Sequence, residues 1–225
     1  MKRLVLLLSL LLALLLPGQG IAGSPTTGIL DTFTGTNGDD LEVYSANWTA
    51  LVGTLEIQGS AATGLAAQTG YYAWDATTFG PNPEAHAPWN TLGANDEILG
   101  LLIRLTTLDI GTVDGYFAIW KSLTGASNDT LEIAKIVNGV PGAALASTTF
   151  EATAGDQMFF EGIGTTLTIY INGTQRLQTT DSDYGAAGYI GLVIENATSR
   201  VTEFGGGTVV AGGAETTGFY KRRLQ

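Results

Sequence analysis

The stretch TLTIYINGTQRLQTTDSDYGAAGYIGLVIE, residues 166–195, carries the clearest structural signal in the chain. Apolar and polar residues alternate before Asn172-Gly173, and they alternate again after the acidic segment at 181–183. A period of two is typical of a strand with one buried face. Asn-Gly indicates a type I′ hairpin, because both central positions of that turn need a positive φ. The stretch therefore predicts a hairpin, an acidic turn and a further strand.

Short segments of the same kind recur along the chain, and no long segment after residue 22 has the period of an α-helix. The expected strands are 29–33, 54–58, 70–74, 97–105, 115–121, 130–136, 145–150, 157–162, 166–172, 189–195 and 199–204. Many short strands separated by turn residues are typical of a sandwich. The predicted fold class is all-β, a two-sheet antiparallel jelly-roll sandwich. Residues 76–95 are expected to form its longest loop.

The two ends of the chain differ from this body. Met1-Lys2-Arg3, the apolar run 4–16 and the small residues Gly20 and Ala22 describe a secretory signal peptide. The run is shorter than the roughly 20 apolar residues that span a bilayer. We expect a signal peptide at 1–22, one domain at 23–208, a Gly-rich tail with a basic end at 209–225, and secretion to the extracellular space. An uncleaved anchor is the alternative.

Composition excludes several classes of function. The chain has no cysteine, which excludes disulfides, cysteine zinc sites and thiol catalysis. Its net charge is −11, and residues 23–220 hold five basic residues against 21 acidic ones. A nucleic-acid binder needs a basic surface, and an anionic membrane repels an acidic one. Neither nucleic acid nor membrane is therefore an expected partner.

A series of segments, in this order, resembles the concanavalin A-like lectin/glucanase superfamily in its laminin-G-like branch. The segments are DTFTGTNGDDL (31–41), GYFAIWK (115–121), TLEIAKIVNG (130–139), GTTLTIYINGTQ (164–175), TDSDYGAAGYIGL (180–192) and VTEFGGG (201–207). The resemblance covers residues 29–208. It implies a jelly roll whose first and last strands, around Phe33 and Phe204, lie close together. Lectins, glucanases, adhesion proteins and virion proteins share this fold, so the fold does not choose among their functions.

We do not expect catalysis. Retaining glucanases of the superfamily carry Glu-x-Asp-x-Glu or Glu-x-Asp-x-x-Glu on one strand, and their mechanism needs two carboxylates about 5–5.5 Å apart. This chain lacks the motif, and its acidic pairs lie in turn-like contexts: Asp39-Asp40, Asp96-Glu97, and Asp181 with Asp183. The single histidine, His86, lies in the expected long loop without a nucleophile elbow, so it makes no triad.

Three aromatic residues, Tyr116, Trp120 and Tyr170, are the candidates for ligand binding. Tyr116 and Trp120 alternate with Phe117 and Ile119, and Tyr170 points away from its aliphatic neighbours on the 166–172 strand. If Phe117 and Ile119 face the core, the three rings line an outer sheet face, where aromatic rings stack on sugars. The alternative is that the rings cap the core edge or lie singly on the surface.

The acidic turn is the candidate metal site. Calcium takes six to eight oxygen ligands, and Asp181 and Asp183 supply two. The resemblance implies calcium at the sandwich rim. Asp and Ser also build turns by bonding the backbone two residues on, so a structural turn is favoured and calcium is the alternative. Asn37, Asp39 and Asp40 form a second, weaker candidate. No other cofactor is expected.

Two functions remain open. The favoured one is a non-enzymatic, secreted carbohydrate-binding or adhesion module whose partner is a polysaccharide or glycan. The alternative is a structural subunit of an extracellular or virion assembly. There the basic end of the tail, Lys221-Arg222-Arg223, mediates self-association by docking on another acidic copy, unless it is simply disordered. Four Asn-x-Thr sequons are possible glycan acceptors: Asn47, Asn128, Asn172 and Asn196.

Overall fold

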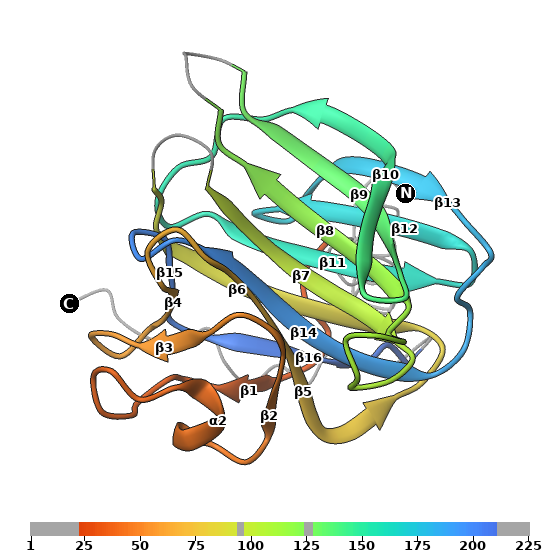
Figure 1. The fold of residues 1–225 in the computed structure, drawn as a ribbon. Helices are drawn as coiled ribbons and strands as arrows, with labels where there is room; N and C mark the ends of the chain where they lie inside the picture. The colour runs from red at the N-terminus through yellow and green to blue at the C-terminus, as the bar shows by residue number, and fades with distance from the viewer. Residues whose placement is uncertain (1–22, 94–96, 124–127, 211–225) are drawn as a thin grey trace, which may run out of the picture.

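The computed structural model describes residues 23–93, 97–123 and 128–210, which form a sandwich of two antiparallel sheets (Figure 1). One sheet has nine strands: β1 (Ile29–Asp31), β3 (Leu55–Ile57), β4 (Ala62–Gly64), β6 (Pro83–Thr91), β11 (Gln157–Ile163), β12 (Thr166–Ile171), β13 (Thr174–Thr180), β15 (Arg200–Val201) and β16 (Phe204–Thr208). Its order is β13-β12-β11-β6-β15-β4-β3, with β16 paired to β6 and β1 paired to β16.

The other sheet has seven strands: β2 (Trp48–Val52), β5 (Thr69–Phe79), β7 (Ile98–Leu105), β8 (Gly115–Lys121), β9 (Thr130–Val137), β10 (Val140–Thr149) and β14 (Gly188–Glu195). Its order is β10-β9-β8-β7-β14-β5-β2. The short helix α2 (Leu41–Tyr44) precedes β2. The predicted fold class, an all-β two-sheet antiparallel jelly-roll sandwich, is confirmed. The described ranges contain no helix with the length and hydropathy that a membrane crossing needs.

The first and last strands lie together, as the sequence resemblance implies. Strand β1 pairs with β16, and Asp31 stands opposite Phe204. Phe33 and Phe204 both pack on the indole of Trp48, at 5.9 and 5.0 Å between ring centroids. The predicted signal peptide and the basic end of the tail lie outside the described residues, so both stay predictions.

The predicted hairpin is confirmed. Asn172 and Gly173 have φ values of 51° and 76°, so both central positions are left-handed, as a type I′ turn requires. The Asn172 side chain also connects the turn to the start of β11. Its Oδ1 accepts the N–H of Gln157 at 2.9 Å, and its Nδ2 donates to Asp156 Oδ1 at 2.7 Å. This sequon asparagine is therefore a structural turn residue.

The predicted loop at 76–95 is wrong. Strand β5 extends to Phe79, and β6 fills Pro83–Thr91 in the middle of the nine-stranded sheet, where it pairs with β11, β15 and β16. His86 is thus a buried strand residue, 5% exposed, and not a loop residue. Prolines at 81, 83 and 88 give this segment the composition of a loop. Pro83 is tolerated because it is the first residue of its strand.

The seven-stranded sheet is apolar on both faces. Tyr116, Ala118 and Trp120 of β8 belong to the main core between the sheets. Phe117 and Ile119 belong instead to a second apolar cluster on the outer face. Leu108 and Val113, from the connection between β7 and β8, pack in the same cluster. Both halves of the β8 alternation are therefore buried, and the period of two does not reveal which half faces the core.

Arg104 on β7 ties three connections together at one end of the sandwich. It is 2% exposed, and its guanidinium donates only to carbonyl oxygens: Pro81 at 3.0 and 2.8 Å, Gly162 at 3.0 Å, Gly164 at 2.7 Å and Tyr184 at 3.2 Å. Among the described residues no carboxylate forms an ion pair with it. Burial lowers the pKa of this side chain. The carbonyls therefore take the place of a counter-ion.

Replacing Arg104 tests this arrangement. Arg104→Met leaves four carbonyls without their donor, and each unsatisfied buried acceptor costs about 1–3 kcal/mol. We expect a loss of more than about 3 kcal/mol in urea unfolding. Arg104→Lys keeps the charge and three donors, so it should lose less. Arg200→Met, a half-buried arginine on β15 whose guanidinium forms no hydrogen bond or ion pair with the described residues, is the control. An Arg104→Met protein as stable as this control would contradict the role given to the guanidinium.

Gly173→Val tests the hairpin. An added Cβ meets no close neighbour at this position, since the nearest atom is Gly23 O at 3.8 Å, so the change adds only backbone strain. A β-branched residue resists positive φ, and we expect a loss of about 1 kcal/mol or more in thermal or urea unfolding. Gly185→Val, where φ is not left-handed and no atom lies within 4 Å, is the matched control. Equal melting temperatures for the two variants would refute the strain.

Candidate functional site

A recess of about 320 Å³ is lined by residues of β1, α2 and β5 and of the segments that adjoin β1 and α2. The elements β1, α2 and β2 lie at the lower edge of the view in Figure 1. Its lining comes from three separate parts of the sequence: Ile29, Leu30, Asp31 and Thr32; Tyr44, Ser45 and Asn47; and Trp74. The recess thus combines aromatic rings, a carboxylate, a hydroxyl and an amide. These are the group types that form small-molecule sites on an apolar floor.

Asp31 is the carboxylate of the recess, and it is 8% exposed. Its Oδ1 accepts the N–H of Phe33 at 2.8 Å and the hydroxyl of Tyr44 at 2.9 Å. Its Oδ2 accepts the indole N–H of Trp48 at 2.8 Å. A carboxylate has about four acceptor positions, so one position on Oδ2 stays available. Three hydrogen bonds therefore fix the Asp31 carboxylate, and one acceptor position on Oδ2 has no partner among the described residues.

Two aromatic residues, Tyr44 and Trp74, line the recess, and Trp74 packs on other core rings. Trp74 packs edge-on against Trp48 at 5.3 Å, and Trp48 packs on Phe204 at 5.0 Å. Burial, followed by the hydrogen bond to Asp31, raises the pKa of the Tyr44 hydroxyl, which therefore stays protonated and donates to that carboxylate. The rings are fixed by the core beneath them, so the recess is pre-formed.

Asn47 supplies the polar rim. It is exposed, and its backbone is fixed because its carbonyl accepts the N–H of Asp75 at 2.8 Å. Its backbone N–H donates to Ser45 Oγ at 3.3 Å. The side-chain amide has no hydrogen-bond partner within 23–93, 97–123 and 128–210, so two donors and one acceptor face solvent. An amide and a carboxylate in the lining of one recess suit a ligand with several hydroxyls.

Solved structures of other proteins share this fold. They include the carbohydrate-binding module CBM66 from Bacillus subtilis (19% identity, 72% of this chain and 94% of that chain, TM-score 0.55). A legume lectin-like domain from Entamoeba histolytica has 13% identity over 81% of this chain and all of that chain, with a TM-score of 0.55. The VIP36 exoplasmic/lumenal domain in a Ca²⁺/Man2-bound form has 10% identity over 82% and 90%, with a TM-score of 0.58. The protein has a concanavalin A-like fold.

At these identities the likeness shows the fold alone. No protein family and no curated protein matches the sequence. The superfamily part of the sequence resemblance is confirmed at the level of the fold, and the laminin-G-like branch stays a prediction.

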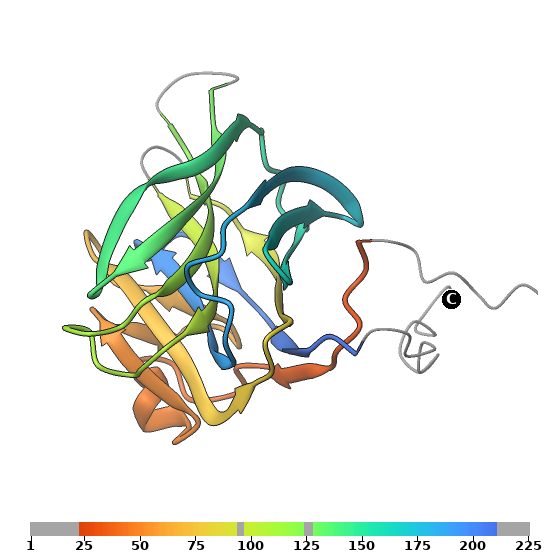
Figure 2. The same ribbon diagram turned by 90° about the vertical axis from the view of Figure 1, so that its right-hand side faces the viewer.

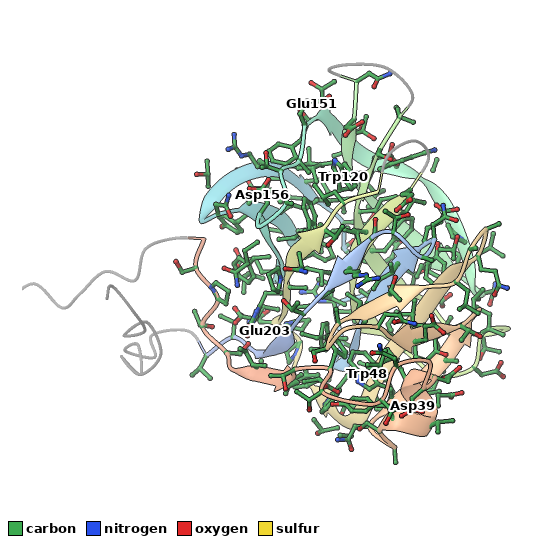
Figure 3. The ribbon with its side chains drawn as sticks, turned by 90° about the vertical axis from the view of Figure 1, so that its left-hand side faces the viewer. Asp39, Trp48, Trp120, Glu151, Asp156 and Glu203 are labelled. Atoms are coloured by element: carbon green, nitrogen blue, oxygen red, sulfur yellow. The ribbon has the colours of Figure 1, made fainter. Side chains whose placement is uncertain are left out.

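The predicted aromatic face does not form on this concanavalin A-like sandwich. Tyr116 and Trp120 are 0% and 2% exposed and lie in the core between the sheets. Trp120 packs on Trp89 at 5.7 Å, and its Nε1 donates to Phe150 O at 3.2 Å. Figure 3 shows Trp120 in the interior, well separated from Trp48. The expectation was wrong because it placed Phe117 and Ile119 toward the core, whereas they face outward.

Tyr170 does point away from the core, on the outer face of the other sheet, but it is 9% exposed. Its ring stacks on Phe159 at 5.2 Å, and its hydroxyl donates to Glu161 Oε1 at 3.0 Å. The structure therefore brings Tyr170 together with neither Tyr116 nor Trp120, and the three rings offer no joint stacking surface.

The acidic turn is a structural corner. The N–H of Asp183 donates to Asp181 Oδ1 at 3.0 Å, which is the favoured Asx-type turn. Lys135 Nζ bridges the two carboxylates, at 3.0 Å from Asp181 Oδ2 and 2.6 Å from Asp183 Oδ2. The hydroxyl of Tyr116 donates to Asp181 Oδ1 at 2.6 Å. In place of the alternative calcium ion, a lysine supplies the positive charge.

The second metal candidate is also built into local structure. Asp40 caps α2 by accepting the N–H of Glu42 at 2.9 Å, and it accepts the hydroxyl of Tyr72 at 3.0 Å. Asp39 accepts the N–H of Thr36 at 3.3 Å, and Asn37 accepts that of Gly59 at 2.8 Å. Within the described ranges no three His, Asp or Glu residues are arranged to hold a metal ion.

The charge balance at the corner lowers the pKa of Asp181. Burial raises the pKa, but hydrogen bonds from Tyr116, from the N–H of Asp183 and from Lys135 outweigh this effect. A carboxyl group with a lowered pKa stabilises the fold above its unfolded pKa of about 4, and this stability is lost as the pH falls.

Lys135→Met tests the corner. Without the ammonium the two carboxylates repel each other, so we expect a lower melting temperature than wild type at pH 7 and low salt. Added CaCl₂ should restore part of the melting temperature by supplying a cation. The difference in melting temperature from wild type should shrink as the pH falls below about 4, where carboxylates are protonated. Lys121→Met, on the neighbouring strand and without an ion pair in the described residues, is the control. A calcium effect of equal size in wild type would contradict the assignment.

Proposed function

We propose that this protein is a carbohydrate-binding module that holds a glycan at the recess of Asp31, Tyr44, Asn47 and Trp74. The observation that carries the proposal is the pairing of an anchored carboxylate with an unpartnered amide beside fixed aromatic rings. The fold supports it, since the similar structures include a carbohydrate-binding module and a domain described in a Man2-bound form. Export and an adhesive role belong to the same proposal.

A sugar ring fits this chemistry. Its hydroxyls donate to the open position on Asp31 Oδ2, and they exchange hydrogen bonds with the Asn47 amide. Its C–H face packs on the half-buried ring of Tyr44, which lies beside the buried Trp74 in the lining. Each hydrogen bond contributes about 1 kcal/mol net, so two or three of them with one ring contact give an affinity of roughly millimolar to micromolar.

The ligand is bound and not cleaved. Glycoside hydrolysis needs two carboxyl groups flanking the scissile bond. Asp31 is the one carboxylate among the residues that line the recess, and its hydrogen bonds to Tyr44 and Trp48 keep it an acceptor. A binding role therefore fits the lining better than a catalytic one.

Asn47→Ala and Tyr44→Phe test the recess. Asn47→Ala removes a polar contact to the ligand, and Tyr44→Phe removes the hydroxyl that orients the Asp31 carboxylate. We therefore expect affinity to fall about three- to tenfold per variant. Glycan-array screening of bacterially produced protein, which lacks N-glycans at Asn47, identifies a ligand, and calorimetry measures the affinity.

The matched controls are Asn90→Ala, an exposed asparagine on β6, and Tyr189→Phe, a half-buried tyrosine on β14. Both should bind like wild type. Loss of affinity in the controls and not in the recess variants would show that the glycan binds outside the recess. Release of reducing sugar from the bound glycan would overturn the non-enzymatic assignment.

A further inference from the structure

Residues 23–28, the strap, lie across the outer face of the nine-stranded sheet. In Figure 2 the strap belongs to the red segment at the right-hand side, which leads into β1. At one end Gly23 lies against the β12–β13 turn, where a Cβ on it would come within 2.4 Å of Gly173 O. At the other end Gly28 O accepts the N–H of Gly206 at 3.1 Å.

Glu84 on β6 anchors the middle of the strap. It is completely buried. Its Oε1 accepts the backbone N–H groups of Thr26 at 2.7 Å and Thr27 at 2.6 Å, and its Oε2 accepts the Thr26 hydroxyl at 3.0 Å. Hydrogen bonds to a charged acceptor are roughly twice as strong as neutral ones. One side chain thus holds two consecutive residues of the strap.

The strap in turn compensates the buried charge of Glu84. Glu161 stands directly opposite Glu84 on β11, and no cation forms an ion pair with either in the described part of the chain. Burial raises the pKa of Glu161. The hydrogen bond from Tyr170 lowers this pKa, and the charge of Glu84 raises it, so that the net shift is upward. Burial also lowers the pKa of His86, two residues from Glu84. The N–H groups of the strap are therefore the main compensation that Glu84 receives.

The strap continues without a break into the recess. Strand β1 follows at Ile29, has three residues, and pairs only with β16 in a register that shifts between Ile29 and Asp31. Its residues line the recess, and Asp31 is the carboxylate of the site. A strand this short and irregular holds its backbone weakly, so the anchored strap before it adds to the restraint that Phe33, Tyr44 and Trp48 place on the Asp31 carboxylate.

We propose that Glu84 is a positioning residue for the recess: by holding Thr26 and Thr27 it fixes β1 and the orientation of the Asp31 carboxylate. This inference rests on the proposed function for its consequence in binding. Glu84 itself lies on the outer face of the sheet and does not line the recess. Its effect on a ligand passes through the strap.

The test compares Glu84→Ala with Glu84→Gln. Alanine removes all three hydrogen bonds. Glutamine keeps them without the charge, because its Oε1 accepts both N–H groups and its Nε2 donates to the Thr26 hydroxyl oxygen. Glu161→Gln is the matched control, since this neighbouring carboxylate bonds Tyr170 and not the strap. Thr27→Pro removes one of the N–H donors on the strap side. It provides a second test of the same contact if Glu84→Ala does not fold.

Two readouts need no glycan. Amide exchange of Thr26 and Thr27 reports the strap, and the indole NMR signal of Trp48, assigned with Trp48→Phe, reports Asp31 because its N–H donates to Oδ2. We expect Glu84→Ala to speed the exchange of both amides, and Thr27→Pro to speed that of Thr26, by more than about tenfold. Both variants should shift the Trp48 signal. Glu84→Gln and Glu161→Gln should leave both near wild type. Faster exchange with an unmoved Trp48 signal would overturn the positioning role.

Binding to the array glycan separates the two proposals. Loss of affinity in Glu84→Ala with rescue in Glu84→Gln supports both. A moved Trp48 signal in a protein whose wild type binds no glycan overturns the proposed function and leaves the coupling of Glu84 to Asp31 standing. Unchanged binding and an unmoved signal in Glu84→Ala and Thr27→Pro overturn the coupling and leave the function standing.

Discussion

The guanidinium of Arg104 is the interaction on which one end of the sandwich depends. Three connections that are far apart in the sequence present carbonyl oxygens to it, from Pro81, Gly162, Gly164 and Tyr184. Carbonyls at strand ends have no partner within the sheet, and burying them without a donor is costly. One planar group with five donors satisfies them together. A single side chain therefore holds the three connections at this end of the sandwich next to one another.

Local signals in the sequence predicted the fold well. Asn172-Gly173 needs no distant partner to form its turn, because positive φ is a property of those residue types. The β6 segment was predicted as a loop because its prolines are locally typical of loops, whereas its strand character comes from pairing with β11, β15 and β16. The polar strand β13 is the second arm of the predicted hairpin, but it has no range of its own among the expected strands, because its side chains are mostly exposed and its apolar alternation is weak.

The candidate site was much less predictable. Alternation in β8 indicates two faces but not which one is inside, and here both are apolar. The residues that line the recess come from three separate parts of the sequence, 29–32, 44–47 and 74, so no local motif indicates the site. Asp31 stands out only once the structure places it beside Tyr44 and Trp48. Lys135 and Asp181 are likewise 46 residues apart in sequence, which hides their ion pair from any motif search.

Because Lys135 bridges the two carboxylates of the acidic corner, the order of this corner does not depend on the concentration of a dissolved ion. A metal ion at such a corner occupies its site according to its free concentration and a dissociation constant. An ammonium carried by the chain is present at a fixed local concentration. The corner therefore has no occupancy to lose on dilution, and one of its two negative charges is compensated from the moment that β9 and the 181–183 turn come together during folding.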